Sequence, residues 1–188
     1  MGNSLTFPPI FRGKLVRLAA ATAADAESFA RWSNDDEYLR LLDDDPIRPM
    51  AAGEFTWISD PKPDPNSASF QIRTIVDDKH IGFVVLHTIK WPSQSCMVAI
   101  GIGEEEYRGR GYGSEAMNLA LNYAFNELNL HRVELIVMAY NTRAIASYEK
   151  LGFVREGVKR EAVQRFGVRY DVLCYAILRP EWTARQLA

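Results

Sequence analysis

The sequence predicts a single domain of the mixed α/β (α+β) class, built on a central mixed, mostly antiparallel sheet of about seven strands flanked by helices. Three observations lead to this class. The chain has 188 residues, about the size of one domain, of which 47% are hydrophobic and 24% are charged. Short runs with strand character recur along it, and one long segment between them has the period of an amphipathic helix. No linker or repeat separates these segments, so residues 1–188 are expected to form one domain.

The first elements are a short strand and a helix. Residues 14–18 form a short run of strand character. Thr22 is expected to be the N-cap of a helix, because its hydroxyl can accept a hydrogen bond from the first helical turn. This helix is expected to run to about Trp32, with Asp25 and Glu27 favourable near its positive end.

The next segment is acidic and rich in proline. Residues 35–49 contain two prolines and are expected to be mostly loop or broken helix. A further short helix is expected within residues 50–58. Residues 60–66 alternate proline with polar residues, which excludes helix and central strand and predicts a loop.

The middle of the chain predicts an antiparallel meander. Three strand-like runs follow one another at residues 68–76, 80–90 and 95–102. Residues 77–79 are expected to form a tight turn between the first two, and residues 91–94 separate the second from the third.

The pattern then changes to a helical period. Six apolar residues have the spacing of one face of an amphipathic helix: Met117, Ala120, Leu121, Ala124, Phe125 and Leu128. Residues 132–138 are expected to be a strand, and residues 142–151 a helix that ends at Gly152. Two last runs, at residues 153–163 and 169–178, are expected to form a hairpin around residues 164–168.

Composition narrows the function. The formal net charge of −2 gives no general attraction to nucleic acid or to an anionic membrane, and no apolar run reaches the ~18 residues of a membrane helix. The acid-rich front suits a cationic substrate and the base-rich end an anionic one, although both can equally be solvated surface. Cys96 and Cys174 lie in apolar runs and are expected to be buried free thiols, which fits the cytoplasm. No metal is expected, and His80, His87 and His131 receive no role because they show no ligand or triad spacing.

The N-terminus lacks the apolar region of a signal peptide but fits another targeting template. Residues 1–6, Met-Gly-Asn-Ser-Leu-Thr, match the pattern for N-myristoylation. Six loosely constrained positions often match by chance, so this pattern does not enter the functional interpretation.

The strongest chemical signature is the glycine-rich stretch between the third strand of the meander and the long helix. The N-terminus of a helix has free backbone N–H groups and a partial positive charge, and glycines let a ligand approach these groups. Arg108 and Arg110 add charge there, so the stretch predicts an anion site suited to phosphate. The P-loop lysine is absent, and the spacing Gly109-x-Gly111-x-Gly113 differs from the dinucleotide fingerprint. The alternative is a strand-to-helix turn without a ligand.

One further pattern fits, Arg/Gln-x-x-Gly-x-Gly/Ala, which residues 108–113 satisfy. Here the chain resembles the GCN5-related N-acetyltransferase (GNAT) superfamily. The resemblance continues through residues 141–153, which are similar to the family segment Asn-x-x-Ala-x-x-x-Tyr-x-Lys-x-Gly-Phe. Residues 128–135 and 156–172 resemble the branch of ribosomal-protein N-terminal and spermidine acetyltransferases. The match is good over about residues 95–178, whereas the first ninety residues agree only in the order of their elements.

The resemblance implies a GNAT-like fold and transfer of an acetyl group from acetyl-coenzyme A, the co-substrate, to a primary amine through a tetrahedral intermediate. The acceptor stays open among a protein N-terminus, a polyamine and a small-molecule amine. The residues implied in coenzyme binding share the strand end, the glycine loop and the helix after residue 141. They are Ile100, Ile102, Gly103, Arg108, Gly109, Arg110, Gly111, Tyr112, Gly113, Ser114, Asn141, Arg143, Ala144, Tyr148 and Lys150.

The resemblance also places two catalytic candidates. Tyr148 is implied beside the coenzyme sulfur, where a phenol that is protonated at neutral pH can give its proton to the leaving thiolate; the alternative is a tyrosine packed on an apolar helix face. Asn141 is implied near the pantetheine arm, or is simply a helix N-cap. The oxyanion donor is expected to be a backbone N–H of the strand at residues 100–103. Gly101 and Gly103 are expected to form a bulge that splays this strand from its neighbour.

The general base is the least determined part. Glu104 is the carboxylate closest to the strand in sequence, although residues 104–106 also suit a solvated corner. Glu161, Asp171 and a water chain are alternatives. Residues 43–45, three aspartates, suit recognition of a cationic amine or simply face solvent.

A rival function class is a non-catalytic acyl-coenzyme A sensor or assembly module on the same fold. The presence of both Tyr148 and Asn141 favours the enzyme. A homodimer through the edge of the meander or through the hairpin is also compatible with the pattern.

Overall fold

The structure is a computed structural model that describes residues 9–59 and 62–186. The myristoylation template at residues 1–6 therefore lies outside the described residues, as do residues 60–61 of the proline-rich loop. The rest of that loop, residues 62–66, contains no helix or strand, as expected.

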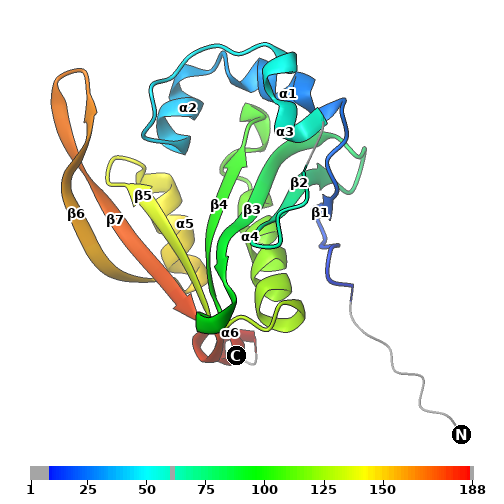
Figure 1. Cartoon of the computed structure of the whole chain (residues 1–188), viewed down its shortest axis with the longest axis vertical. Coiled ribbons are helices and arrows are strands. Elements are labelled where there is room, and N and C mark those ends of the chain that lie inside the picture. The colour runs from blue at the N-terminus through cyan, green and yellow to red at the C-terminus, as the bar shows by residue number, and fades with distance from the viewer. Residues whose placement is uncertain (1–8, 60–61, 187–188) are drawn as a thin grey trace, which may run out of the picture.

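One seven-stranded sheet runs through the chain in the order β1-β2-β3-β4-β5-β7-β6 (Figure 1). Its strands are β1 (Val16–Ala19), β2 (Ala68–Thr74), β3 (His80–Lys90), β4 (Ser95–Ile102), β5 (Arg132–Met138), β6 (Val154–Arg165) and β7 (Val168–Leu178). The pair β4–β5 is parallel, and the other neighbouring pairs are antiparallel. The predicted central, mostly antiparallel sheet of about seven strands is therefore confirmed.

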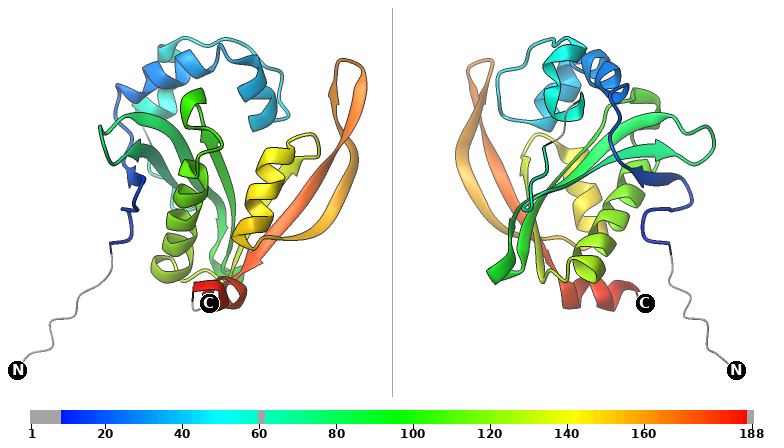
Figure 2. Two further views of the ribbon diagram at one scale, coloured as in Figure 1. Left: turned by 180° about the vertical axis from the view of Figure 1, so that it is seen from behind. Right: turned by 45° about the vertical axis from the view of Figure 1, so that its right-hand side comes forward.

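Helices lie on both faces of this sheet. They are α1 (Asp25–Trp32), α2 (Asp36–Leu42), α3 (Thr56–Ser59), α4 (Tyr112–Asn122), α5 (Thr142–Leu151) and α6 (Arg179–Gln186). Figure 2 shows α4 and α5 against one face, with α1, α2 and α3 grouped over the end of the sheet where β4 finishes. Short 3₁₀ turns lie at Ala52–Glu54, Trp91–Ser93 and Glu105–Tyr107, and α4 continues into a π-helical turn at Tyr123–Glu127.

The main core lies between α4 and the sheet. The predicted apolar stripe is buried there, including Leu121 and Phe125, which are both 0% exposed. Burial of each such side chain stabilises the fold by ~1.5–3 kcal/mol. A second cluster forms around Phe29 and Trp32 and packs α1, α2 and α3 together. The core thus holds α4 firmly on the sheet and fixes the position of its N-terminus.

Three local predictions in the first third were wrong. Thr22 is not the N-cap of α1: the Asp25 carboxylate instead accepts from the Thr22 N–H at 2.8 Å and from its hydroxyl at 3.0 Å. The expectation of mostly loop at residues 35–49 holds for residues 43–49 but is wrong for residues 36–42, which form the regular helix α2 because the Asp35 side chain caps it by accepting from the Tyr38 N–H at 2.9 Å. β1 begins later than expected because the Glu115 carboxylate takes the backbone N–H groups of residues 14–16.

The second half agrees more closely with the sequence. β3, β4, β5 and α5 have the expected bounds, and Gly152 ends α5 with φ +100°. The hairpin turn is shorter than expected, because Phe166 and Gly167 both have positive φ and reverse the chain in two residues. The C-terminal helix α6 was not expected at all.

Candidate active site

The parallel strands β4 and β5 separate after a short contact. They pair at Ser95↔Arg132, Cys96↔Val133 and Met97↔Glu134, and then β4 continues to Ile102 and β5 to Met138 without further pairing between them. Along these stretches, each facing edge carries backbone N–H and C=O groups that an extended ligand can pair with. The expected splay of β4 from its neighbour is therefore confirmed.

The expected bulge is wrong at Gly101 but not at Gly103, because the backbone N–H groups of Gly103 and Glu104 both donate to the Ile81 carbonyl, at 2.9 and 3.3 Å. The register of β4 with β3 is continuous from Gly82↔Ile102 to His87↔Met97. The two glycines also allow α1 and α2 to pack closely: a Cβ on Gly103 would lie 2.0 Å from the Trp32 ring, and one on Gly101 would lie 2.6 Å from the Tyr38 hydroxyl.

A cavity of about 690 Å³ fills the space between the separated strands. Its wall combines both strand edges with the glycine loop, the start of α4, one side of α5 and the end of α2. Most residues implied in coenzyme binding line it: Ile100, Ile102, Arg108, Gly109, Gly111, Gly113, Ser114, Asn141, Arg143, Ala144, Tyr148 and Lys150. The structure thus brings together two segments that lie some thirty residues apart in the sequence.

The glycine loop has the geometry expected of an anion cradle. Gly109 and Gly111 have φ of +73° and +89°, a region that favours glycine. Gly111 is the N-cap of α4 and offers no side-chain cap, so the first N–H groups of this helix lack intrahelical partners and lie at its positive end. Gly113 has an ordinary φ, but a Cβ there would already lie 3.4 Å from Ile102, so glycine keeps the helix start close to the end of β4.

Arg108 contradicts the expectation that its charge faces a phosphate. Its guanidinium donates to the carbonyls of Ile102 at 2.9 Å and Gly103 at 2.6 Å, and lies 2.9 Å from the Asp35 carboxylate. With its side chain only 10% exposed, it acts as an internal clamp between the loop and α2.

Three other implied coenzyme residues lie outside the cavity wall. Gly103 is buried against Trp32, and Tyr112 packs edge-on against Tyr107 with ring centroids 5.0 Å apart. Arg110 is exposed, and within the described chain no ion pair engages it. Arg110 is thus the loop arginine whose charge is available, although it stands at the rim.

Two candidates on α5 meet the cavity as expected. Tyr148 lines it, and burial raises the pKa of its phenol to about 12, so the group keeps its proton at neutral pH. Asn141 is confirmed as the N-cap of α5, since its Oδ1 accepts from the Ala144 N–H at 3.1 Å. Its Nδ2 also donates to the Leu41 carbonyl at 3.1 Å, so the same amide joins α5 to α2.

Two further hydrogen bonds connect the C-terminal end of α2 to residues of the C-terminal half of the chain, across the cavity. The Tyr140 hydroxyl donates to the Arg40 carbonyl at 2.7 Å, and the Arg165 guanidinium donates to the Asp43 carbonyl at 2.9 Å. The last carbonyls of a helix lack intrahelical donors, and here side chains from the C-terminal half supply them. No local sequence pattern indicates these contacts, because the partners lie about a hundred residues apart.

Glu104 does not occupy the position expected of a general base. Its carboxylate accepts from Arg31 at 2.8 Å and Trp32 at 3.0 Å, and it lies 3.1 Å from Lys79. Burial alone would raise its pKa, but these three donors outweigh burial and hold the pKa below its ordinary value. Glu104 also lies outside the cavity wall, as do the alternatives Glu161 and Asp171.

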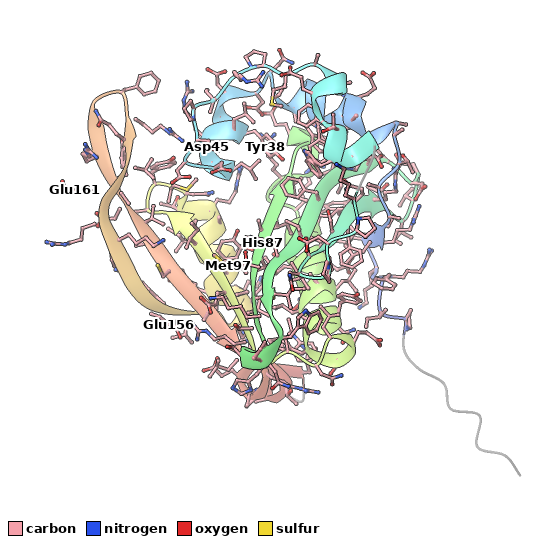
Figure 3. All side chains as sticks on the ribbon, viewed as in Figure 1. Tyr38, Asp45, His87, Met97, Glu156 and Glu161 are labelled. Atoms are coloured by element: carbon pink, nitrogen blue, oxygen red, sulfur yellow. The ribbon has the colours of Figure 1, made fainter. Side chains whose placement is uncertain are left out.

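The cavity wall contains three polar side chains to which the sequence analysis gave no definite chemical role. His87 of β3 and Asp43 after α2 both line the cavity. Tyr38 lines it too, and its hydroxyl is buried without a hydrogen-bond partner among the described residues. Figure 3 shows how Tyr38 stands above His87 and Met97 on the sheet. The alternation of side chains along β3 predicts which face of the sheet His87 lies on. Only the tertiary packing of α2 over that face shows that His87 lines the cavity.

Comparison with known proteins agrees with this fold. Residues 16–154 match the model of the acetyltransferase (GNAT) domain, and the chain therefore belongs to the GNAT acetyltransferase family. Among curated relatives, the probable N-acetyltransferase YjcK of Bacillus subtilis is 38% identical over 113 residues, which are 60% of this chain and 62% of YjcK. The spermidine N(1)-acetyltransferase of Vibrio cholerae is 35% identical over 116 residues, or 60% of this chain and 66% of that protein. These matches span slightly less than two thirds of each relative.

Solved structures match over a larger part of the chain. The spermidine N-acetyltransferase of Vibrio cholerae in complex with CoA and spermine superimposes with a TM-score of 0.77 at 26% identity, covering 89% of this chain and 98% of that one. A crystal structure described as a probable acetyltransferase has the same TM-score at 24% identity, which supports the fold alone. Within the described residues, no helix combines the length and apolarity needed to cross a membrane.

Proposed function

We propose that this protein is an acetyl-coenzyme A-dependent N-acetyltransferase that transfers an acetyl group to a primary amine by direct attack through a tetrahedral intermediate. One observation carries this function. The open edges of β4 and β5 form a cleft that begins at the uncapped N-terminus of α4 and reaches Tyr148. Acetyl-coenzyme A carries a thioester on a phosphorylated arm. Its binding and reaction require an anion cradle, an unpaired strand edge and a proton donor, and this cleft combines all three.

The coenzyme is expected to bind along this cleft. Its pyrophosphate would meet the backbone N–H groups of residues 109–114, and its pantetheine arm would pair with the open edge of β4 at residues 98–102. Arg143 and Lys150 are exposed in the cleft wall on α5, and Arg110 stands at the rim, so all three can complement phosphate charge. Arg108 supports the cradle from inside.

The chemistry then needs two donors and a base. A backbone N–H of β4 near Ile100 would stabilise the oxyanion, and Tyr148 would protonate the leaving thiolate. Asn141 would hold the start of α5 against α2 and contact the arm from the cleft wall. Tyr148 both lines the cleft and packs against Phe153 and the core, so only the acetyl-transfer assay separates the enzyme from the rival non-catalytic module.

The acceptor is expected to be a cationic amine. Asp43 lines the cleft beside Asp44 and Asp45, and burial together with these neighbours raises its pKa. The structural neighbour from Vibrio cholerae was solved with spermine, so polyamines are the first class to test. A protein N-terminus and a small-molecule amine are the other classes.

The acetyltransferase unit is expected to include all of residues 1–188. The family model ends at residue 154, yet β7 continues the same sheet by pairing with β5 over residues 172–178. Cys96 is buried as expected, whereas Cys174 is only half-buried; both thiols are free, which suits the reducing cytoplasm. A homodimer stays a prediction that sedimentation velocity can test.

The test uses the purified protein with acetyl-coenzyme A and a panel of amines. Acetyl-coenzyme A should raise the melting temperature by mass action, and a suitable amine should release free thiol. The panel contains spermidine, spermine, peptides with free N-termini and simple primary amines. Absence of stabilisation by any coenzyme A thioester would overturn the proposal, and stabilisation without thiol release from any amine would favour a sensor.

A further inference from the structure

A β-bulge interrupts β3 directly after His87. The register runs from His87↔Met97 to Lys90↔Ser95, so β3 uses one residue more than β4 between these pairs. Thr88 inside the bulge has φ +53°, in the left-handed region that a β-branched residue adopts only under strain. Bulges next to active sites often redirect a side chain, and strained residues persist where the surrounding structure holds them for a function.

The bulge lies at the closed end of the cleft. Met97, opposite His87, is the last residue of β4 that pairs with β5 before the strands separate. His87 lines the cavity there, and Figure 3 shows it beside Met97. An arm that enters at the N-terminus of α4 and follows β4 inward from Ile102 therefore runs toward Met97 and the His87 imidazole.

Thr88 also fixes the imidazole. The Thr88 hydroxyl oxygen lies 3.1 Å from His87 Nδ1. If the Nδ1–H donates to this oxygen, the Nε2 lone pair is left for another partner, because a neutral imidazole carries one proton. The strained residue and the orienting contact are thus one and the same threonine.

Competing proton acceptors are few in this cleft. Glu104 is held by three donors outside the wall. Among the described residues that line the cavity, only Asp43 and His87 can accept a proton near neutral pH. Asp43 is exposed on the loop with two further aspartates, which suits binding of a cation. His87 stands at the closed end of the cleft, three residues along the sheet from the pair Val84↔Ile100, and an imidazole is better matched than a carboxylate to an amine at neutral pH.

We infer that His87 is the general base of the acetyl transfer and that Thr88 is the residue that positions it. This inference rests on the proposed function and extends it to the step that the sequence left unassigned.

The proton balance of the step is complete. Nε2 of His87 removes one proton from the acceptor ammonium and later releases it to solvent. The freed amine forms the C–N bond to the thioester carbonyl, the C–S bond breaks, and Tyr148 gives its proton to the thiolate. The new amide nitrogen loses a proton to the Tyr148 phenolate, which restores the phenol. The products are the N-acetylated amine, coenzyme A and one proton.

The pKa of the His87 imidazole depends on the groups that surround it. Burial lowers its pKa below the ordinary value of 6.5, so the imidazole is neutral at physiological pH. On the neighbouring elements, Asp43 and Tyr38 stand across the cavity, Glu134 of β5 pairs in register with Met97, and Lys90 follows along β3. Glu134 lies 2.8 Å from Arg132 Nε and shares this guanidinium with Glu156. A base must be neutral, so turnover should be lost as the pH falls through this lowered pKa.

The experiment compares H87Q with H131Q, which changes an exposed histidine outside the cavity. With spermidine or the best amine of the panel, H87Q should lose about 100-fold in kcat, the lower end of what general base catalysis contributes. It should keep the stabilisation by acetyl-coenzyme A and lose the acidic limb of the pH profile, whereas H131Q should behave as wild type. Equal kcat and an unchanged acidic limb in H87Q would overturn the inference while leaving the acetyltransferase function intact. A wild type that binds no acetyl-coenzyme A would overturn both.

Thr88 provides the independent arm. T88V removes the hydroxyl and keeps the branched shape, whereas T88S keeps the hydroxyl. T88V should lower kcat several-fold with KM for acetyl-coenzyme A unchanged, and T88S should restore most of the activity. In nitrogen NMR spectra of the histidine rings, His87 should carry its neutral proton on Nδ1 in wild type and T88S, and a tautomer mixture in T88V. Identical kcat and tautomer in T88V and wild type would refute the positioning role even if H87Q does not fold.

Discussion

The guanidinium of Arg108 lies 2.9 Å from the Asp35 carboxylate and joins the glycine loop to the N-cap of α2. The same group donates to the last carbonyls of β4. A single side chain thus holds three edges of the cleft: the end of β4, the anion cradle and the start of α2. The residue that most resembles a phosphate ligand in the sequence is the one that assembles the cradle.

The first prediction concerns this clamp. Arg108→Ala should lower the free energy of unfolding by about 3 kcal/mol, because it leaves buried carbonyls and Asp35 without their donor. Arg110→Ala is the matched control and should change it by less than about 0.5 kcal/mol, as for an exposed residue without partners. Urea denaturation measures both values. Equal stability of the two variants would contradict the clamp.

The second prediction concerns the anion cradle. Gly111→Asp places a carboxylate at the N-terminus of α4 and should abolish the rise in melting temperature caused by acetyl-coenzyme A. Gly167→Asp is the matched control, because Gly167 has a similar φ of +79° and an added Cβ would meet nothing within 4 Å. Both positions have positive φ, so each variant carries backbone strain, and the comparison is therefore between the ligand-bound and ligand-free melting temperatures of each variant. Retained stabilisation in Gly111→Asp would place the coenzyme elsewhere.

The third prediction concerns Tyr148. Tyr148→Phe should lower kcat by about 100-fold through loss of the proton donor, with stabilisation by acetyl-coenzyme A retained. Burial raises the pKa of this phenol to about 12, so its donor function is present at lower pH and is lost only as the pH rises toward that value. The wild-type rate should therefore show no loss from this group between pH 7 and 10. Tyr112→Phe serves as the control, and unchanged turnover in Tyr148→Phe would exclude the role.

The fourth prediction separates Glu104 from catalysis. Glu104→Gln should destabilise the fold at pH 7 by about 1–3 kcal/mol, since the carboxylate binds charged and neutral donors, while kcat stays near the wild-type value. The pKa of Glu104 is held below its ordinary 4.5, so this stability is present above pH 4.5 and is lost as the pH falls through the lowered pKa. Denaturation of both proteins from pH 7 to pH 3.5 should show the difference shrinking. A large fall in kcat at constant stability would return Glu104 to the catalytic candidates.

Much of the second half of the fold was predictable from local pattern. The apolar stripe from Met117 to Phe125 identified the core helix, and Asn141 and Gly152 marked the ends of α5. These signals depend on the backbone within one element. The first third failed where side chains from elsewhere decided the boundary, as when Glu115 took the N–H groups that would have started β1 earlier.

The sequence by itself identified the family, the glycine stretch as a candidate anion site and Tyr148 as a candidate proton donor. Each of these depends on residues that lie close together in the chain. Tertiary structure decided the use of the charged and titratable groups. Arg108 and Glu104 each form ion pairs with other residues of the fold, and His87 is one of the residues that line the cleft. A charge is available for a ligand only if no nearer partner takes it. Here the partners come from α1, from the N-cap of α2 and from the turn before β3, all remote in sequence from the groups that they bind.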